Sequence, residues 1–173
     1  MSNVPHMTPA DLLIDAFGRI RDLSHRVLDG LDEEALTHRP APDANPVGWL
    51  VWHQLRVQDD HIADVAGTEQ VWSAQGFVER FALPYDADAT GYGQSSADVG
   101  AFTAPTDLLA DYADAVTETT VGYLKGVGAD ELDRVVDTSW DPPVTLAVRL
   151  VSVVGDDLQH LGQAAYVKGL LGR

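Results

Sequence analysis

Four segments of the chain carry apolar residues at helical spacing, and each lies between residues that typically start or stop helices. Thr8-Pro9 and Asn45-Pro46 each combine a cap residue with a proline suited to the first turn, and Gly67 is a typical stop. Long helices are therefore predicted over four ranges: 9–29, 46–66, 105–125 and 146–170. The last begins with a valine-rich run, but its helical periodicity continues to the end. The pattern predicts an all-α protein, a four-helix bundle with long crossover connections.

The connections between these segments differ in length and content. Residues 31–45 hold acidic residues and two prolines, which predicts a connection with one short turn. Residues 67–104 combine glycines with several aromatic residues, so we expect one or two short helices and a packed loop over one end of the bundle. Asp141-Pro142-Pro143 interrupts the chain before the last helix.

Composition narrows the classes of function. The 173 residues, 45% apolar and 22% charged, predict a single globular domain over 1–173 with a short flexible tail at 1–7. A net charge of −16, from 27 acidic and 11 basic residues, disfavours binding to nucleic acid or to anionic membranes. No run approaches the roughly 18 apolar residues of a membrane-spanning helix, and no secretion signal is evident, so we expect a cytoplasmic protein. Because the chain has no cysteine, any thiol chemistry must use sulfur from a bound ligand.

Two of the six histidines, His53 and His160, lie on helix faces that should point inward. A buried imidazole needs a polar partner, since burial without one costs on the order of 1–3 kcal/mol. Asp156 precedes His160 by four residues, so the two side chains stack on adjacent turns, about 6 Å apart and within reach of one ion. If the three converge, their metal-binding atoms should lie within about 4.5 Å of one another. Asp60 and His61 lie about 10 Å beyond His53 and are weaker candidates.

The residues alone leave other interpretations open. Asp156 and His160 could form a simple ion pair on a helix, with His53 a histidine satisfied within the core. Asp157 lies three residues before His160, on the other flank of the same face. Asp157 could replace Asp156 as a ligand. Alternatively, it could orient the imidazole of a ligating histidine without binding the metal itself. We expect Asp156 to be the ligand and Asp157 to be the orienting group.

The segment NPVGWLVWHQLRVQDDH, followed much later by DDLQHLGQAAYVKGLL, resembles the DinB-like superfamily. Within it, the chain is similar to the actinobacterial branch related to mycothiol-dependent maleylpyruvate isomerase. The resemblance covers essentially the whole chain and includes a ligand-x-x-x-His-x-Gly-Gln pattern in the last helix. It implies a divalent metal, usually zinc or nickel, held by His53, Asp156 and His160. The commonest pattern has His at the position of Asp156, whereas the isomerase branch has Glu there.

Three protein ligands leave one coordination position open, as in catalytic metal sites. The resemblance then implies a metal-dependent thiol S-transferase or isomerase that acts on a small electrophile, with mycothiol or a similar low-molecular-weight thiol as co-substrate. A metal-dependent hydrolase is the alternative, because a bound metal also activates water. A third interpretation is a non-catalytic metal-binding stress-response bundle, whose homodimer interface would account for apolar helix surface. Arg149, three turns before His160 on the same face, is either a candidate cofactor-binding residue for an acidic group or an ordinary surface residue.

Overall fold

The computed structural model describes residues 7–173, so His6 and the predicted tail, apart from Met7, lie outside the described residues. Its elements are, in chain order, α1 (Pro9–Leu28), α2 (Glu33–Thr37), α3 (Val47–Ala66), α4 (Val71–Ala74), α5 (Phe77–Phe81), α6 (Ser96–Gly100), α7 (Thr106–Leu124), the 3-10 helix η1 (Ala129–Asp133), β1 (Val135–Asp137), β2 (Val144–Thr145) and α8 (Leu146–Leu170). The long helices α1, α3, α7 and α8 begin and end within one residue of the predicted ranges.

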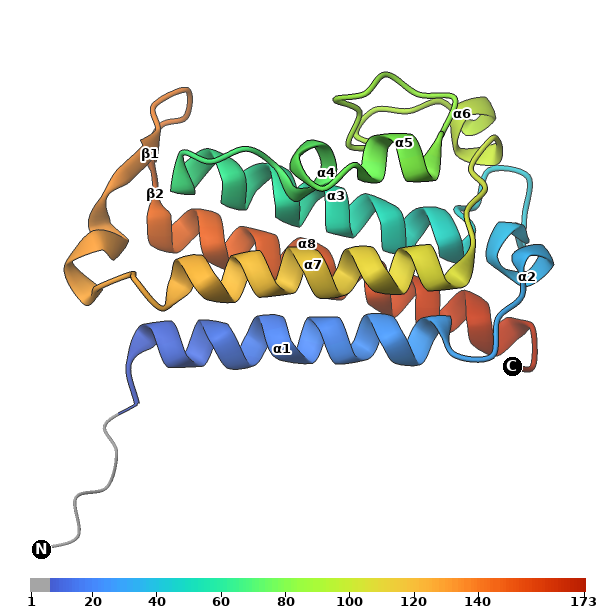
Figure 1. Cartoon of the computed structure of the whole chain (residues 1–173), viewed down its shortest axis with the longest axis horizontal. Helices are drawn as coiled ribbons and strands as arrows, with labels where there is room; N and C mark the ends of the chain where they lie inside the picture. Colours follow the sequence, from blue (N-terminus) through green and yellow to red (C-terminus); the bar gives the residue numbers. More distant parts are fainter. Residues whose placement is uncertain (1–6) are drawn as a thin grey trace, which may run out of the picture.

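These long helices form a bundle (Figure 1), which confirms the predicted all-α fold class. α3 packs against α7 and α8, and α1 packs against the same two helices from the other side. α1 and α8 run in the same direction along the bundle, whereas α3 runs opposite to α8. Buried apolar side chains from all four helices make one core, which includes Phe17, Trp52, Leu109 and Leu161. The candidate ligands on α3 and α8 therefore belong to neighbouring helices.

Most of the residues expected to start and stop helices do so. Thr8 and Asp11 form a reciprocal capping box at the start of α1. Gly67 ends α3 in the left-handed conformation, at a φ of +66° that glycine adopts without steric cost. The start of α3 differs from the expectation, because Pro46 rather than Asn45 holds the cap position, with no side-chain hydrogen bond. Burial of the first half of α3 compensates for this weak cap.

Residues 67–104 run back along the flank of α3, which corrects the prediction that they cover one end of the bundle. They form three short helices rather than one or two. The buried carboxylate of Asp59 accepts hydrogen bonds from the first two backbone N–H groups of α4, both at 2.8 Å. Arg56, fully buried 3.6 Å from Asp59, donates to the carbonyl of Ala89 at 3.1 Å. Because buried charges need such partners, this pair fixes the path of the segment along α3.

Several smaller elements lie in the other connections. α2 is the short turn expected within residues 31–45, but the antiparallel pair of β1 and β2 was not predicted. The predicted break at Asp141-Pro142-Pro143 lies in the turn between these strands. Strands of three and two residues are too short to show an alternating pattern in the sequence.

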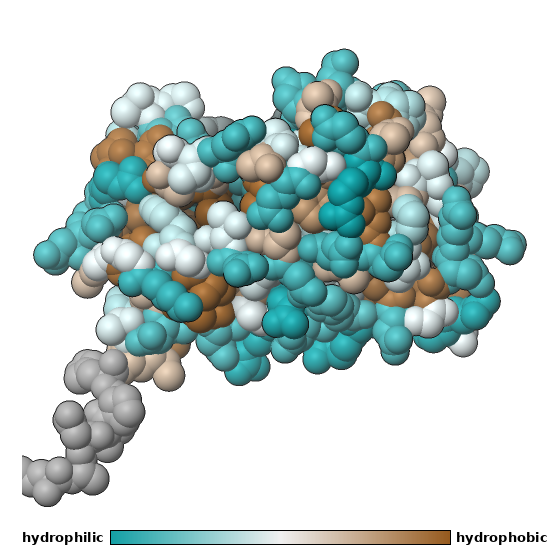
Figure 2. All heavy atoms as spheres, viewed as in Figure 1, coloured by the Kyte–Doolittle hydropathy of each residue, from teal (hydrophilic) through white to brown (hydrophobic). Residues whose placement is uncertain are grey.

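The surface reflects the acidic composition. Figure 2 shows hydrophilic side chains over most of one face of the molecule, with smaller apolar areas between them. Within the described range, no helix combines the length and the apolar character needed to cross a membrane. Half of the large apolar side chains that remain exposed in this range belong to α8.

Candidate metal centre

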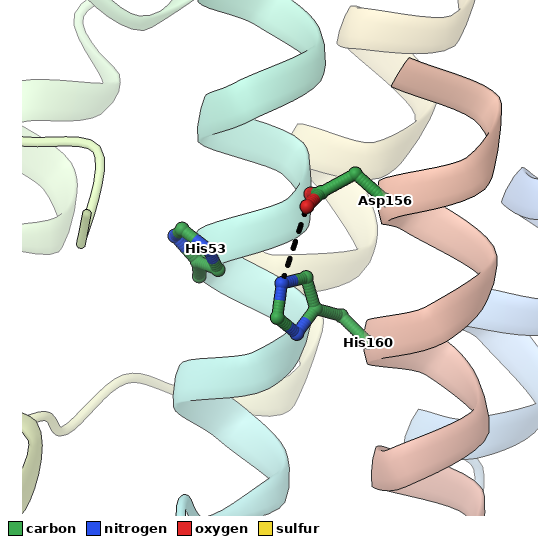
Figure 3. Close-up of side chains that lie close together, drawn as sticks. All are labelled: His53, Asp156 and His160. Carbon is green, nitrogen blue, oxygen red and sulfur yellow. Dashed lines mark ion pairs between the residues drawn. The ribbon is translucent and has the colours of Figure 1, made fainter. Parts of the chain in front are cut away.

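The candidate ligands come from α3 and α8, which pack closely against each other. His53 lies in the first half of α3, while Asp156 and His160 lie one turn apart on α8, and the three side chains point toward one another (Figure 3). One ligand atom from each residue lies within 4.8 Å of the other two, and the ring centres of the two histidines are 4.7 Å apart. The structure thus brings together the three residues that the sequence singled out.

The spacing of the three ligand atoms is slightly wider than expected. Two ligands that each lie about 2.2 Å from one ion can be at most about 4.4 Å apart. The observed limit is 4.8 Å. Asp156 and His160 contact each other directly, with 3.5 Å between Oδ1 and Nε2. The difference of about 0.4 Å is small enough for side-chain rotation to close, because changes in the χ angles move these terminal atoms without moving either helix.

The orientation of His53 is set by a loop. Its Nδ1 donates a hydrogen bond of 2.5 Å to the carbonyl oxygen of Thr90, so Nε2 is the nitrogen left to accept. The ring stacks on Trp49 at 4.7 Å, and the Trp49 indole donates to Gln94 at 2.8 Å. Gly91 has a φ of +94°, and a Cβ there would lie 2.7 Å from Nδ1 of His53. The sequence did not predict the contacts of His53 with Thr90 and Gly91 or that of Trp49 with Gln94.

Two buried atoms of the cluster lack hydrogen-bond partners within the described residues. They are Oδ2 of Asp156 and Nδ1 of His160. Buried polar atoms nearly always form hydrogen bonds in folded proteins, so two such atoms without a partner in one cluster need an explanation. A donor set of two imidazoles and one carboxylate is one that zinc and other divalent ions accept. The residues therefore fit a divalent cation.

The protonation of the cluster follows from its surroundings. Burial lowers the pKa of His53, and the positive charge of His160 adds to this. The hydrogen bond that His160 donates to the carboxylate of Asp156 raises the pKa of His160 above its ordinary value. Burial alone would raise the pKa of Asp156, but its hydrogen bond with His160 and the charges of the nearby imidazoles bring it below the usual range. These shifts favour the neutral form of His53 and the charged forms of Asp156 and His160.

Asp157 does not take either of its predicted roles. Its side chain is completely buried, and neither carboxylate oxygen forms a hydrogen bond with another described residue. It therefore neither joins the cluster of ligand atoms nor orients an imidazole through a hydrogen bond. Successive residues of a helix are about 100° apart, so Asp157 points into the core when Asp156 faces α3. Burial and the neighbouring charge of Asp156 raise the pKa of Asp157 well above its ordinary value.

Arg149 lies beyond the cluster, about 10 Å along α8 from Asp156. Its side chain is 18% exposed and its guanidinium is already paired, with 3.0 Å between Nη2 and Oδ2 of Asp137 on β1. Nη1 lies 3.3 Å from Nδ1 of His61, to which it donates. Burial lowers the pKa of His61, and the charge of Arg149 adds to this effect. As predicted, Asp60 and His61 stay outside the cluster of ligand atoms.

A four-helix bundle of this connectivity, with a candidate metal site between its second and last long helices, defines the DinB-like class of proteins, and here Asp156 stands where the commonest pattern has His. The chain belongs to the mycothiol S-transferase family, which it matches over residues 12–172. It is also similar to the crystal structure of a conserved protein from Enterococcus faecalis, with a TM-score of 0.90, 30% identity, and coverage of 97% of this chain and 100% of that chain. No curated protein matches the sequence. The predicted superfamily and its mycothiol-related branch are confirmed.

Proposed function

We propose that the protein is a metal-dependent mycothiol S-transferase that acts on a small electrophile. The observation that carries the proposal is the convergence of ligand atoms from His53, Asp156 and His160 within 4.8 Å, with two buried polar atoms of the cluster lacking a hydrogen-bond partner among residues 7–173. Membership of the mycothiol S-transferase family supports a small thiol as co-substrate. The absence of cysteine means that no thiol of the protein competes for the site.

In this proposal His53, Asp156 and His160 hold a divalent ion, with zinc the first expectation and nickel the second. When bound, such an ion supplies the Lewis acidity that lowers the pKa of a thiol toward the nucleophilic thiolate. The protein's own part is to orient the ligands. Thr90 fixes the ring of His53 through Nδ1, and the pairing of Asp156 with His160 fixes the second imidazole. Asp156 is 37% exposed, which leaves one side of the cluster open to solvent and to small reactants.

Arg149 enters the proposal as the anchor for an acidic group of the thiol or the electrophile. Its Nε is buried without a partner among the described residues, although both terminal nitrogens are engaged. An anchoring role predicts that Arg149→Ala raises KM and leaves kcat nearly unchanged. Asp137→Asn is the control, because it releases the guanidinium while retaining its charge. If Arg149 only holds β1 against α8, both substitutions will lower stability equally and leave KM unchanged.

The experiment is a turnover assay on protein stripped of metal and then loaded with zinc or nickel. We expect conjugation or isomerisation of generic small electrophiles only when both the metal and mycothiol are present. His53→Ala and His160→Ala should abolish turnover while the helical circular dichroism signal is retained, since the fold rests on apolar packing. His38→Ala is the matched control, because His38 is exposed and lies outside the cluster.

Three other results would contradict the proposal. Metal-dependent turnover without any thiol would indicate the hydrolase. Firm metal binding with no turnover across a panel of thiols and electrophiles would indicate the non-catalytic metal-binding bundle. Failure of the wild-type protein to bind zinc or nickel in calorimetric titration would remove the metal centre itself.

A further inference from the structure

His61 lies in the same seam between α3 and α8 as the candidate metal centre (Figure 3), but outside its cluster of ligand atoms. Eight residues of helix separate it from His53, which is about 12 Å along the axis of α3. Its imidazole contacts Arg149 of α8, and 33% of its side chain is exposed. A small molecule that is bound beside the cluster can therefore reach His61 along the seam.

A chain of fixed contacts sets the tautomer of His61. Ser139 donates to Oδ1 of Asp137 through its backbone N–H at 2.8 Å and through its hydroxyl at 2.7 Å. Oδ2 of Asp137 holds Nη2 of Arg149 at 3.0 Å, and Nη1 of Arg149 donates to Nδ1 of His61 at 3.3 Å. Because a guanidinium can only donate, Nδ1 must present its lone pair. A neutral His61 therefore carries its proton on Nε2.

The contact with Arg149 also favours the neutral form of His61. A second proton, on Nδ1, would point at a guanidinium N–H and would lose this hydrogen bond. Oδ2 of Asp60 lies 3.9 Å from Nδ1, which is beyond hydrogen-bonding distance. Burial, followed by the charge of Arg149, lowers the pKa of His61, although three carboxylates oppose this effect: Asp60, Asp64 and Asp156.

The Nε2 atom of His61 is available to another molecule. Within residues 7–173 it forms no hydrogen bond, and it is not among the buried polar atoms that lack a partner. A neutral imidazole that is fixed at one nitrogen and has a free N–H at the other is suited to bind an oxygen acceptor. Such a preorganised donor is most effective where negative charge develops during a reaction.

The distance from the cluster limits the kind of electrophile that can use this donor. A reacting carbon beside the cluster and an oxygen beside His61 belong to one small molecule only if several bonds separate them. An epoxide or an alkyl halide does not fit, because the atom that takes the electrons is attached directly to the reacting carbon. A carbonyl group conjugated with a carbon–carbon double bond does fit, because conjugation carries charge over several bonds.

The reaction of such an electrophile is balanced without a proton from His61. A thiolate adds to the double bond, so that a carbon–sulfur bond forms and the displaced π electrons move through the conjugated system to the carbonyl oxygen. A hydrogen bond from Nε2 stabilises the charge on that oxygen. Water then supplies a proton to a carbon of the conjugated chain, and the electrons return to restore the carbonyl group.

We propose that His61 is the hydrogen-bond donor for the carbonyl oxygen of a conjugated, unsaturated electrophile, and that Arg149 is the positioning residue that fixes its tautomer. This inference rests on the proposed function and names the class of electrophile for the same site. Arg149 can hold His61 through Nη1 and also anchor an acidic group, since its Nε has no partner among residues 7–173.

The first test compares two substitutions of nearly equal size. The side chain in His61→Gln offers both an acceptor for Arg149 and an N–H donor, whereas the carboxylate in His61→Glu offers acceptors alone. With an unsaturated ketone and mycothiol, His61→Glu should lower kcat about a hundredfold, and His61→Gln should lower it less than about tenfold. If His61 only supports Arg149, both variants will keep the wild-type kcat. His38→Glu, with the same change at an exposed position, is the matched control.

The second test repeats these assays with benzyl chloride, in which the leaving chloride is attached to the reacting carbon. His61→Glu should lower kcat far less with benzyl chloride than with the ketone. Equal losses with the two electrophiles would overturn the proposal. Absence of any turnover by the wild type would overturn the proposed function and this inference together. Turnover of the ketone that His61→Glu leaves unchanged would overturn this inference alone.

The third test reads the tautomer of His61 directly and requires no turnover. In protein labelled with ¹⁵N at histidine, long-range ¹H–¹⁵N correlation spectra at pH 7 distinguish the two neutral tautomers from the imidazolium. The signal of His61, assigned by its loss in His61→Gln, should be that of the Nε2–H tautomer. The Nδ1–H tautomer or an imidazolium at this pH would overturn the proposal, whatever the activity of the protein.

Discussion

The Nδ1 atom of His53 lies 2.5 Å from the carbonyl oxygen of Thr90, so one backbone group of a loop decides which nitrogen of this imidazole faces Asp156 and His160. A carbonyl can only accept, so Nδ1 carries the proton and Nε2 presents its lone pair. A group that holds a metal ligand through such a hydrogen bond commonly affects the metal affinity as well as the orientation of the ligand.

Gly91→Ala should therefore disturb the cluster without touching a ligand. The new Cβ would lie 2.7 Å from Nδ1 of His53, and the residue would be held at a φ of +94°. We expect a loss of about 1–3 kcal/mol in the free energy of unfolding and about a 10–100-fold loss in zinc affinity. Gly93→Ala is the control, because it has a φ of +73° but no atom within 4 Å. Equal losses of zinc affinity in both variants would show that the contact with His53 is unimportant.

The pH dependence of metal binding should report the release of one proton. The pKa of His160 is raised, chiefly by its hydrogen bond with Asp156, so below that pKa a proton must leave before the metal binds. The pKa of His53 is lowered by burial, so this ring is already neutral over the same range. The logarithm of the zinc affinity should rise with a slope of about one as pH increases toward the pKa of His160, and then level off.

Asp156→Asn supplies the control for this pH dependence. Without the carboxylate, the pKa of His160 should fall, and the rise in affinity should move to lower pH while affinity at high pH is weaker. Calorimetric titrations between pH 5 and 8 would measure both profiles. A slope of two in the wild type would mean that both imidazoles are protonated before binding, contrary to the surroundings of His53.

Asp157 should be a cost to stability rather than a contributor to the metal site. A buried carboxyl group without a hydrogen-bond partner is unfavourable, so Asp157→Leu should raise the free energy of unfolding by about 1–3 kcal/mol. Zinc affinity should change far less than in Asp156→Ala. Urea denaturation and calorimetry would measure the two effects. Destabilisation by Asp157→Leu, or a larger loss of affinity than in Asp156→Ala, would show that the carboxyl group has a role that its contacts do not reveal.

The anchor of the long segment on α3 should be among the most sensitive points of the fold. Asp59→Ala leaves the guanidinium of Arg56 buried beside an empty position, and we expect a loss of about 3–5 kcal/mol in the free energy of unfolding. Tyr112→Phe removes one neutral donor to the same carboxylate and should lose only about 1 kcal/mol. Urea denaturation would distinguish them. Similar small losses would mean that water replaces the carboxylate beside Arg56.

The sequence was informative wherever a side chain carries the signal. Proline and glycine marked the ends of the long helices, and the four-residue spacing of Asp156 and His160 located the cluster on α8. The partner of His53 is a backbone carbonyl, which has no distinctive side chain to indicate it. The predicted role of Asp157 near the metal was wrong because successive residues of a helix point about 100° apart. That rotation is enough to turn the carboxylate of Asp157 into the core while Asp156 faces α3.

The path of residues 67–104 along α3 was not predicted, for a different reason. It depends on Asp59, whose carboxylate holds the start of α4, and nothing in the local sequence distinguishes that residue from the exposed acids around it. The two-stranded pairing of β1 and β2 depends on only a few backbone contacts between segments too short to have a period. Tertiary contacts rather than local preference decide both features.

The division of the ligands between α3 and α8 has a consequence for how the chain holds together. His53 and its orienting loop are fastened to each other through α3, whereas Asp156 and His160 arrive on a helix from the other end of the chain. An ion shared between them would close a loop of roughly a hundred residues, the length at which a cross-link restricts the unfolded chain by several kcal/mol in the entropic account. In a protein without cysteine, such an ion would be a removable equivalent of a disulfide, and a chelator would lower the free energy of unfolding while the apolar packing of α8 against the bundle is retained.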